Sequence, residues 1–191
     1  MKLPALWRGS AFSVFWIVPI ILLTLIGGCF VYIMILGNST EYINVEKGFK
    51  LVYPVEWTLQ EAPFKEQPSE VVIFYSPKEG NNDKFIENVN IVILDMADNP
   101  MSLKTLTATA LDQLSGTFKD VQVLSNEPIT VGELPGSKFI FASKEESPLK
   151  IMTVLFVVDK KCYQIFYTAA FEKFDAYLPA VNDLISSFRL L

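Results

Sequence analysis

The chain has 191 residues, a formal net charge of −5, 51% hydrophobic residues and 19% charged residues. This length suits one domain with an appendage, and the apolar content excludes an acidic disordered tail. The acidic balance disfavours binding to nucleic acid. The chain contains no histidine, so the commonest general base and the commonest transition-metal ligand are both missing.

The apolar excess is concentrated near the N-terminus. No charged residue occurs in residues 9–40, and residues 11–36 form a run of about 26 mostly apolar residues. As a helix, this run would be about 39 Å long, enough to cross a bilayer core of about 30 Å. The sequence therefore predicts one transmembrane helix over residues 11–36, in contact with the lipid bilayer.

The charges that flank this run predict its orientation. Lys2 and Arg8 precede it, and the first charged residue after it is Glu41. Because basic residues remain on the cytoplasmic side, we expect residues 1–10 in the cytoplasm and the large domain in the thylakoid lumen, the periplasm or the extracellular space.

Three interpretations of the apolar run remain open. A cleaved signal peptide has a shorter apolar core and a small-x-small site, which this run lacks. Lipidation at Cys29 is suggested by the preceding Ile26-Gly27-Gly28, which resembles a lipobox. Residues 30–36 are still apolar, whereas a lipoprotein usually continues with a polar segment. This continuation favours an uncleaved anchor in which the glycines and Cys29 pack on another helix.

Residues 37–47 are rich in Gly, Asn, Ser and Thr and are interpreted as a tether, so the globular domain is expected over 48–191. Beyond residue 36 there are 14 Lys and Arg against 21 Asp and Glu. Strands are predicted where β-branched and aromatic residues gather: 49–53 ending at Pro54, 71–75, 88–94, 121–124, 138–142 after a turn at Leu134-Pro135-Gly136, 150–158 and 161–168. The last two flank Asp159-Lys160, which favours a hairpin.

Two amphipathic helices are predicted between and after these strands. The first follows Ser102, a suitable N-cap, with apolar residues from Leu103 to Phe118 at a period near 3.6. The second runs from Phe174 to Phe188, with Pro179 near its first turn. Two helices are too few for one to follow each strand. The sequence therefore predicts an α+β domain, an antiparallel sheet covered by helices, rather than a doubly wound fold.

The segment Gly48-Phe49-Lys50-Leu51-Val52-Tyr53-Pro54-Val55-Glu56-Trp57 resembles the opening signature of the PsbP-like family, in which Gly-Phe begins a short strand and Pro-x-x-Trp follows it. The strand at 88–93, the helix after it, the glycine-containing turn at 132–136 and the terminal Ser186-Ser187-Phe188 keep the order of that family. In structural terms Gly48, Phe49, Pro54 and Trp57 would start the strand, end it and cover the sheet edge.

This resemblance implies an α–β–α sandwich around an antiparallel sheet. It also implies a non-enzymatic accessory or assembly subunit that binds a membrane protein complex, such as a photosystem, without a cofactor. Related bacterial proteins lie at the cell envelope, so an envelope protein with a non-photosynthetic binding role is the alternative. The chain departs from the plant photosystem proteins in its predicted membrane helix and in its lack of histidine, the metal ligand of some family members.

Few residues are candidates for chemistry. Cys162 lies in a predicted strand with no activating base beside it and is interpreted as a buried apolar residue. Among the carboxylate pairs, Asp95 and Asp98 at a strand end are weak candidates for calcium or manganese, against solvated turn residues. The other pairs are Glu145 with Glu146 and Glu172 with Asp175. Four aromatic residues are weighed as core or as a partner surface: Phe64, Phe74, Tyr75 and Phe85.

Overall fold

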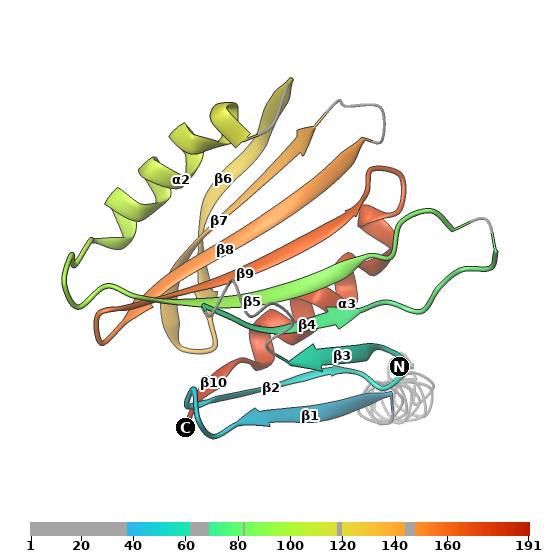
Figure 1. Ribbon diagram of the computed structural model, residues 1–191, viewed down its shortest axis with the longest axis horizontal. Helices are drawn as coiled ribbons and strands as arrows, with labels where there is room; N and C mark the ends of the chain where they lie inside the picture. The colour runs from blue at the N-terminus through green and yellow to red at the C-terminus, as the bar shows by residue number, and fades with distance from the viewer. Residues whose placement is uncertain (1–37, 62–68, 82, 118–119, 144–147) are drawn as a thin grey trace, which may run out of the picture. The chain divides into compact units, whose positions relative to one another are not determined.

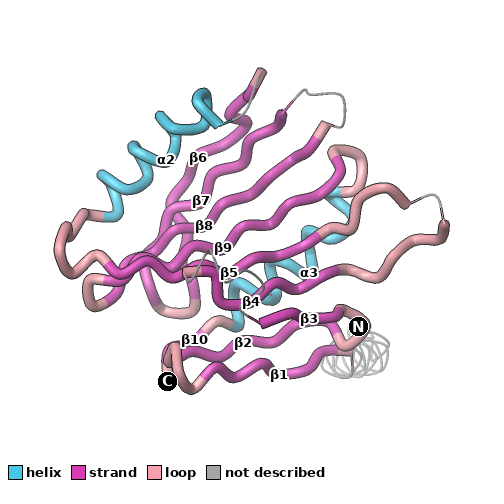
Figure 2. Tube along the Cα trace, viewed as in Figure 1, coloured by secondary structure: helices cyan, strands magenta, loops and turns pink. Residues whose placement is uncertain are grey.

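A computed structural model describes residues 38–61, 69–81, 83–117, 120–143 and 148–191 (Figures 1 and 2). The chain divides into two units, Met1–Ser39 and Thr40–Leu191. In the described part, no helix is both long and apolar enough to span a membrane. The helix expected over 11–36 and Cys29 both lie outside the described residues.

A seven-stranded antiparallel sheet forms the centre of the domain, in the order β3-β4-β5-β9-β8-β7-β6. Its strands are listed here in chain order: β3 Thr58–Glu61, β4 Glu70–Tyr75, β5 Asn88–Asp95, β6 Val121–Val131, β7 Leu134–Ser143, β8 Leu149–Val158 and β9 Lys161–Ala170. The predicted hairpin at Asp159-Lys160 joins β8 to β9, with both residues at positive φ.

Two helices cover opposite faces of this sheet. Helix α2, Leu103–Thr117, packs Leu106 and Leu114 against one face, together with Phe139 and Leu155 of β7 and β8. Helix α3, Phe174–Ser187, packs on the other face. The α–β–α arrangement is therefore observed for the described residues, and the prediction of an α+β domain is confirmed.

A second, three-stranded sheet has the order β1-β2-β10, with β1 at Ser39–Asn44, β2 at Phe49–Pro54 and β10 at Arg189–Leu190. Strand β10 pairs antiparallel with β2. Phe188 joins this sheet to α3 and the large sheet, because its buried ring stacks on Phe49 at 5.2 Å and meets Phe156 edge-on at 5.1 Å.

Three local predictions differ from the structure. The tether expected over 37–47 contains strand β1, whose Tyr42 is buried and meets Phe74 edge-on at 5.6 Å. The turn expected at Leu134-Pro135-Gly136 lies instead at Gly132 and Glu133, because Gly132 adopts φ +60° and β7 already begins at Leu134. Strand β6 continues past 124 to Val131, and its Pro128 is tolerated because β6 is an edge strand.

Candidate binding surface

One corner of the large sheet lies beyond the start of α3. Residues of β6, β7 and the turn from β9 to α3 surround a hollow of about 250 Å³ whose lining is almost entirely apolar. We call it the corner hollow, and its lining residues are Gln122, Leu124, Ala142, Ser143, Pro148 and Phe171. Gln122 and Ala142 are cross-strand partners, so the floor is the sheet itself.

Two large apolar side chains at this hollow are exposed to solvent. Phe171 is 49% exposed and Leu124 is 44% exposed. Leu124 lies in a β-bulge, where the register of β6 against β7 shifts between Val123 and Ser125, and a bulge re-aims a side chain at a sheet edge. The N–H of Phe171 donates to the carbonyl oxygen of Pro148 at 3.0 Å. A bulge and a hydrogen-bonded turn therefore present the two apolar side chains.

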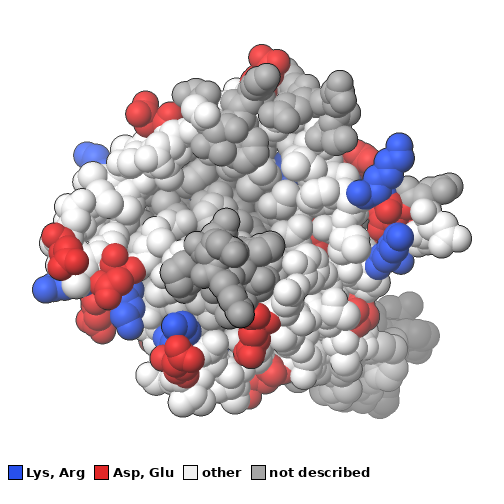
Figure 3. Space-filling view, viewed as in Figure 1, with Lys and Arg blue, Asp and Glu red and all other residues white. Residues whose placement is uncertain are grey.

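Among the described residues near the hollow, the unpaired charges are acidic. Lys150 lies 4.3 Å from the ring centroid of Phe174, and its ammonium pairs with Asp175 at 3.1 Å. Asp120 precedes the hollow-lining part of β6, and Glu172 follows Phe171; both are exposed. Lys150 also lies 6.0 Å from the ring centroid of Phe171. Because Lys150 already has a carboxylate partner, the two exposed acids leave a net negative charge among the described residues around the hollow. In the view of Figure 3, charged side chains lie mainly at the margin of the domain.

Beside this corner, a lysine holds the long loop between β4 and β5 against the start of α3. The Lys173 ammonium lies 2.9 Å from Oδ1 of Asp83 and 3.3 Å from Oε2 of Glu79. The Tyr177 hydroxyl of α3 also donates to Glu79. The hydrogen bond from Lys173 is the main cause that lowers the pKa of Asp83, and the bond from Tyr177 is the main cause that lowers the pKa of Glu79.

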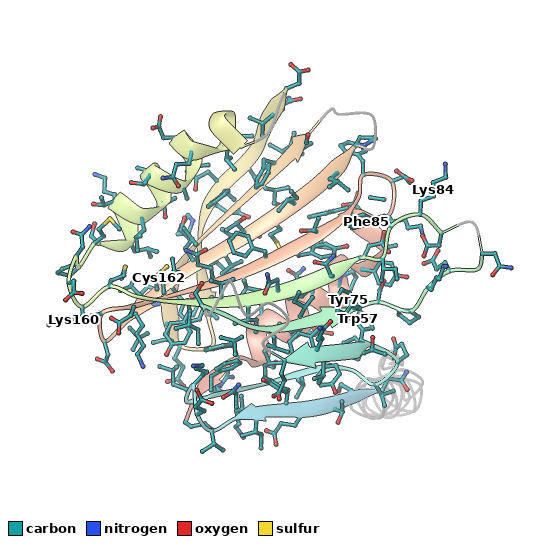
Figure 4. All side chains as sticks on the ribbon, in the orientation of Figure 1. Trp57, Tyr75, Lys84, Phe85, Lys160 and Cys162 are labelled. Atoms are coloured by element: carbon teal, nitrogen blue, oxygen red, sulfur yellow. The ribbon has the colours of Figure 1, made fainter. Side chains whose placement is uncertain are left out.

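A third carboxylate, Glu87, is fully buried next to this lysine network. Ser76 Oγ donates to its Oε2 at 3.4 Å, and its Oε1 has no hydrogen-bond partner. Three acids thus gather around one lysine, yet among the described residues no group of three or more Asp, Glu or Cys is arranged to hold a metal ion. The network's visible role is to fix the loop to the helix. Figure 4 shows Lys84 and Phe85 on this loop.

The predicted metal candidates lie at the opposite end of β5. In the backbone register of β5 against β9, Asp95 lies opposite Lys161. The Oδ1 atom of Asp95 accepts a hydrogen bond from the N–H of Ala97 at 2.8 Å. A separate pocket of about 260 Å³ is lined by Asp95 and Lys161, with Val71 and Ile93 among its other lining residues. Asp98 is exposed and does not line it. The structure therefore gives Asp95 a turn-capping role, and a metal site there stays a prediction.

The four signature residues have structural positions. Gly48 has φ +73°, and Phe49 beside it is fully buried. Pro54 ends β2, and its carbonyl oxygen accepts the N–H of Trp57 at 3.0 Å. Trp57 is buried and meets Tyr177 edge-on at 5.9 Å. Trp57 therefore directly precedes the edge strand β3 and packs against α3.

The remaining candidates separate into core and surface. Cys162 is buried beneath α2, where burial raises the pKa of its thiol. Phe74 is fully buried, which confirms the core interpretation for it, while Tyr75 and Phe85 are half-buried. Glu172 and Asp175 flank the corner hollow. Phe64 and the pair Glu145 with Glu146 lie outside the described residues.

The sequence did not indicate the corner hollow. Its lining comes from three parts of the chain, around residues 122, 143 and 171, and none of them carries a motif. The sequence contains a partial indication of the lysine network. Acidic residues recur every fourth position at 79, 83 and 87, between the predicted strands at 71–75 and 88–94. The spacing alone does not reveal the network, because the partner Lys173 lies 90 residues away from Asp83.

No protein-family model and no curated protein sequence matches the chain. Solved structures do match. Cyanobacterial PsbP (CyanoP) from Synechocystis sp. PCC 6803 has 12% sequence identity and a TM-score of 0.60, over 81% of this chain and 93% of that one. LpqN from Mycobacterium tuberculosis, described as involved in cell envelope biogenesis, has 12% identity and a TM-score of 0.61, over 80% and 90%.

A protein of unknown function from Pseudomonas aeruginosa also matches, with 13% identity and a TM-score of 0.54, over 78% of this chain and 95% of that one. These likenesses extend over most of every chain compared, and at such identities they concern the fold. The antiparallel sheet between two helices, the small second sheet and the matches together show that this domain has the PsbP-like fold.

Proposed function

We propose that the chain is a membrane-tethered, non-enzymatic accessory subunit whose domain, outside the cytoplasm, binds a membrane protein complex. The observation that carries this proposal is the corner hollow, an exposed apolar concavity formed by β6, β7, Pro148 and the turn from β9 to α3. A concavity that can take an apolar side chain of a partner is a common feature at the centre of protein contact sites. The photosynthetic version of the proposal, with a photosystem or its assembly intermediate as the complex, is favoured by the likeness to cyanobacterial PsbP.

The start of β1 sharpens the role of the proposed anchor. If residues 11–36 span the bilayer, only residues 37 and 38 separate that segment from Ser39. Three peptide steps reach at most about 11 Å. A binding domain on so short a connection has a high effective concentration toward a partner in the same membrane. The domain therefore needs only weak intrinsic affinity for that partner.

A second candidate is an envelope protein with a non-photosynthetic binding role. The observation that favours it is the likeness to LpqN, which has a similar TM-score to that of cyanobacterial PsbP. The two candidates share the anchor, the orientation and the binding surface, and they differ in the complex that is bound.

Purification of the tagged full chain from its own membranes in a mild detergent tests the proposal, with identification of the bound chains by mass spectrometry. We expect a stoichiometric membrane complex that survives washing. A photosystem among the bound chains would establish the first version, and an envelope assembly would establish the second. Recovery of the chain alone, also after chemical cross-linking in intact membranes, would contradict both.

A further inference from the structure

We propose that the corner hollow binds one apolar side chain of a partner protein segment that carries a lysine or arginine next to that side chain. This inference rests on the proposed function and specifies the chemistry of the partner.

The size of the hollow suits a side chain better than a free small molecule. Its volume of about 250 Å³ lies below the roughly 300–1,000 Å³ of typical small-molecule pockets. Its lining also offers few polar groups to orient such a ligand. A protein anchor needs no such groups, because its main chain and neighbouring residues supply the orientation. Buried aromatic and aliphatic anchors of this kind dominate the energy of many protein interfaces.

The walls favour an apolar occupant. Phe171 and Leu124 are each more than two-fifths exposed, although both belong to well-formed secondary structure or the turn beside it. Covering these two side chains removes apolar area from water, which favours association. The adjoining edge of β6 also presents main-chain groups for a partner strand. The bulge at Leu124 and, farther along, Pro128 limit such pairing to a short stretch.

The charges near the hollow favour a basic partner. Asp120 and Glu172 are exposed acids that flank it, whereas Lys150 and Lys173 are both engaged in ion pairs. A second copy of this chain would bring the same acids to the contact, and like charges disfavour that arrangement. A partner segment with lysine or arginine beside its apolar anchor is complementary, which raises both specificity and association rate.

A selection from random short peptides displayed on phage, against the purified full chain in detergent micelles, tests this inference. We expect enriched peptides that place a large apolar residue beside Lys or Arg. Synthetic versions should bind roughly tenfold more weakly to the Phe171→Ser and Leu124→Ser variants. They should bind unchanged to Val45→Ser, because Val45 is 80% exposed on the turn from β1 to β2. Thermal unfolding by circular dichroism confirms that each variant is folded.

A charge reversal supplies the second arm. Glu172→Lys should weaken the same peptides, and peptides with Glu in place of the basic residue should then bind better to this variant. Glu133 is an exposed acid near the other end of β6, so Glu133→Lys is the matched control. This variant should bind both sets of peptides as wild type does. No enrichment, enriched peptides without the basic residue, or affinities unchanged by Phe171→Ser and Leu124→Ser would overturn the inference.

Sedimentation velocity distinguishes the other occupant. A dimer of the full chain that Phe171→Ser abolishes would assign the hollow to a second copy and would overturn the inference. The two serine variants also distinguish failure of this inference from failure of the proposed function. If a membrane complex co-purifies equally with wild type and with both serine variants, the accessory role stands and the corner hollow is not its contact site. If the peptides behave as expected but no complex is found, the accessory role fails alone.

Discussion

The ammonium of Lys173 lies 2.9 Å from Oδ1 of Asp83, a residue 90 positions earlier in the chain. This contact ties the loop between β4 and β5 to the start of α3. The Asp83 side chain is only 3% exposed, so the carboxylate depends on this lysine and on the N–H of Glu79, which donates to its Oδ2 at 2.9 Å.

Lys173→Met should therefore lower the melting temperature and make it depend less on pH. The pKa values of Asp83 and Glu79 are lowered in the folded protein from their ordinary values of 3.8 and 4.5. The two ionised carboxylates therefore stabilise the fold fully above those ordinary values. This stabilisation is lost as the pH falls through the lowered pKa values of the folded protein. Differential scanning calorimetry between pH 3 and pH 7 measures the two melting temperatures. A difference in melting temperature between wild type and Lys173→Met that is the same at pH 3 and pH 7 would contradict the prediction. Lys84→Met, on the same loop, is the control.

Gly132→Ala should destabilise the domain strongly. A Cβ at this position would lie 2.5 Å from the carbonyl oxygen of Phe188, and the residue adopts φ +60°. The left-handed conformation alone costs about 1–2 kcal/mol, and the clash with backbone adds to it. Gly48→Ala is the matched control, since Gly48 has φ +73° but nothing within 4 Å of its Cβ position. Equal free energies of unfolding for the two variants in urea would show that the close approach is unimportant.

Phe188→Ala should lower the free energy of unfolding by about 3–5 kcal/mol, because it leaves a cavity among Phe49, Phe156 and Tyr163. Leu191→Ala, at a residue 62% exposed, should change it by less than about 0.5 kcal/mol. Hydrogen exchange should show the largest loss of protection in β2. A uniform loss over all strands would instead mean that the two sheets unfold as one unit.

Asp95→Ala should cost about 0.5–1 kcal/mol through the lost hydrogen bond to the N–H of Ala97, whereas Asp95→Asn keeps an acceptor oxygen and should be close to neutral. Titration calorimetry with calcium and manganese should give no heat of binding in wild type. A binding heat that disappears in Asp95→Asn would establish the metal site that the sequence suggested at Asp95 and Asp98.

Local patterns predicted most of the strands and both helices, because β-branched and aromatic residues gather in the strands and apolar residues recur near a period of 3.6 in the helices. Strand β1 was missed because only Tyr42 among its six residues is buried, so it has no apolar pattern. The second half of β6 was missed for the same reason: Asn126, Glu127 and Pro128 resemble a loop, and only their position at a sheet edge permits a strand.

The candidate surface was beyond the reach of local patterns. Leu124 and Phe171 look like core residues in sequence, and their exposure follows from where α3 begins relative to the sheet corner. The lysine network likewise depends on a pairing across 90 residues. A family resemblance supplied the fold, but signature residues such as Phe49 and Trp57 are buried, so the signature reports packing rather than the contact site.

The pairing of β2 with β10, in which Lys50 lies opposite Arg189, has a consequence for synthesis. Phe49 and Leu51 leave the ribosome early, yet α3 and Phe188, which cover them, are made last. Such long-range contacts slow folding, since distant segments must meet before either is stabilised. During translation α3 and Phe188 do not yet cover these apolar residues, so the nascent chain should be a substrate for chaperones that hold unfolded proteins until the last helix is made.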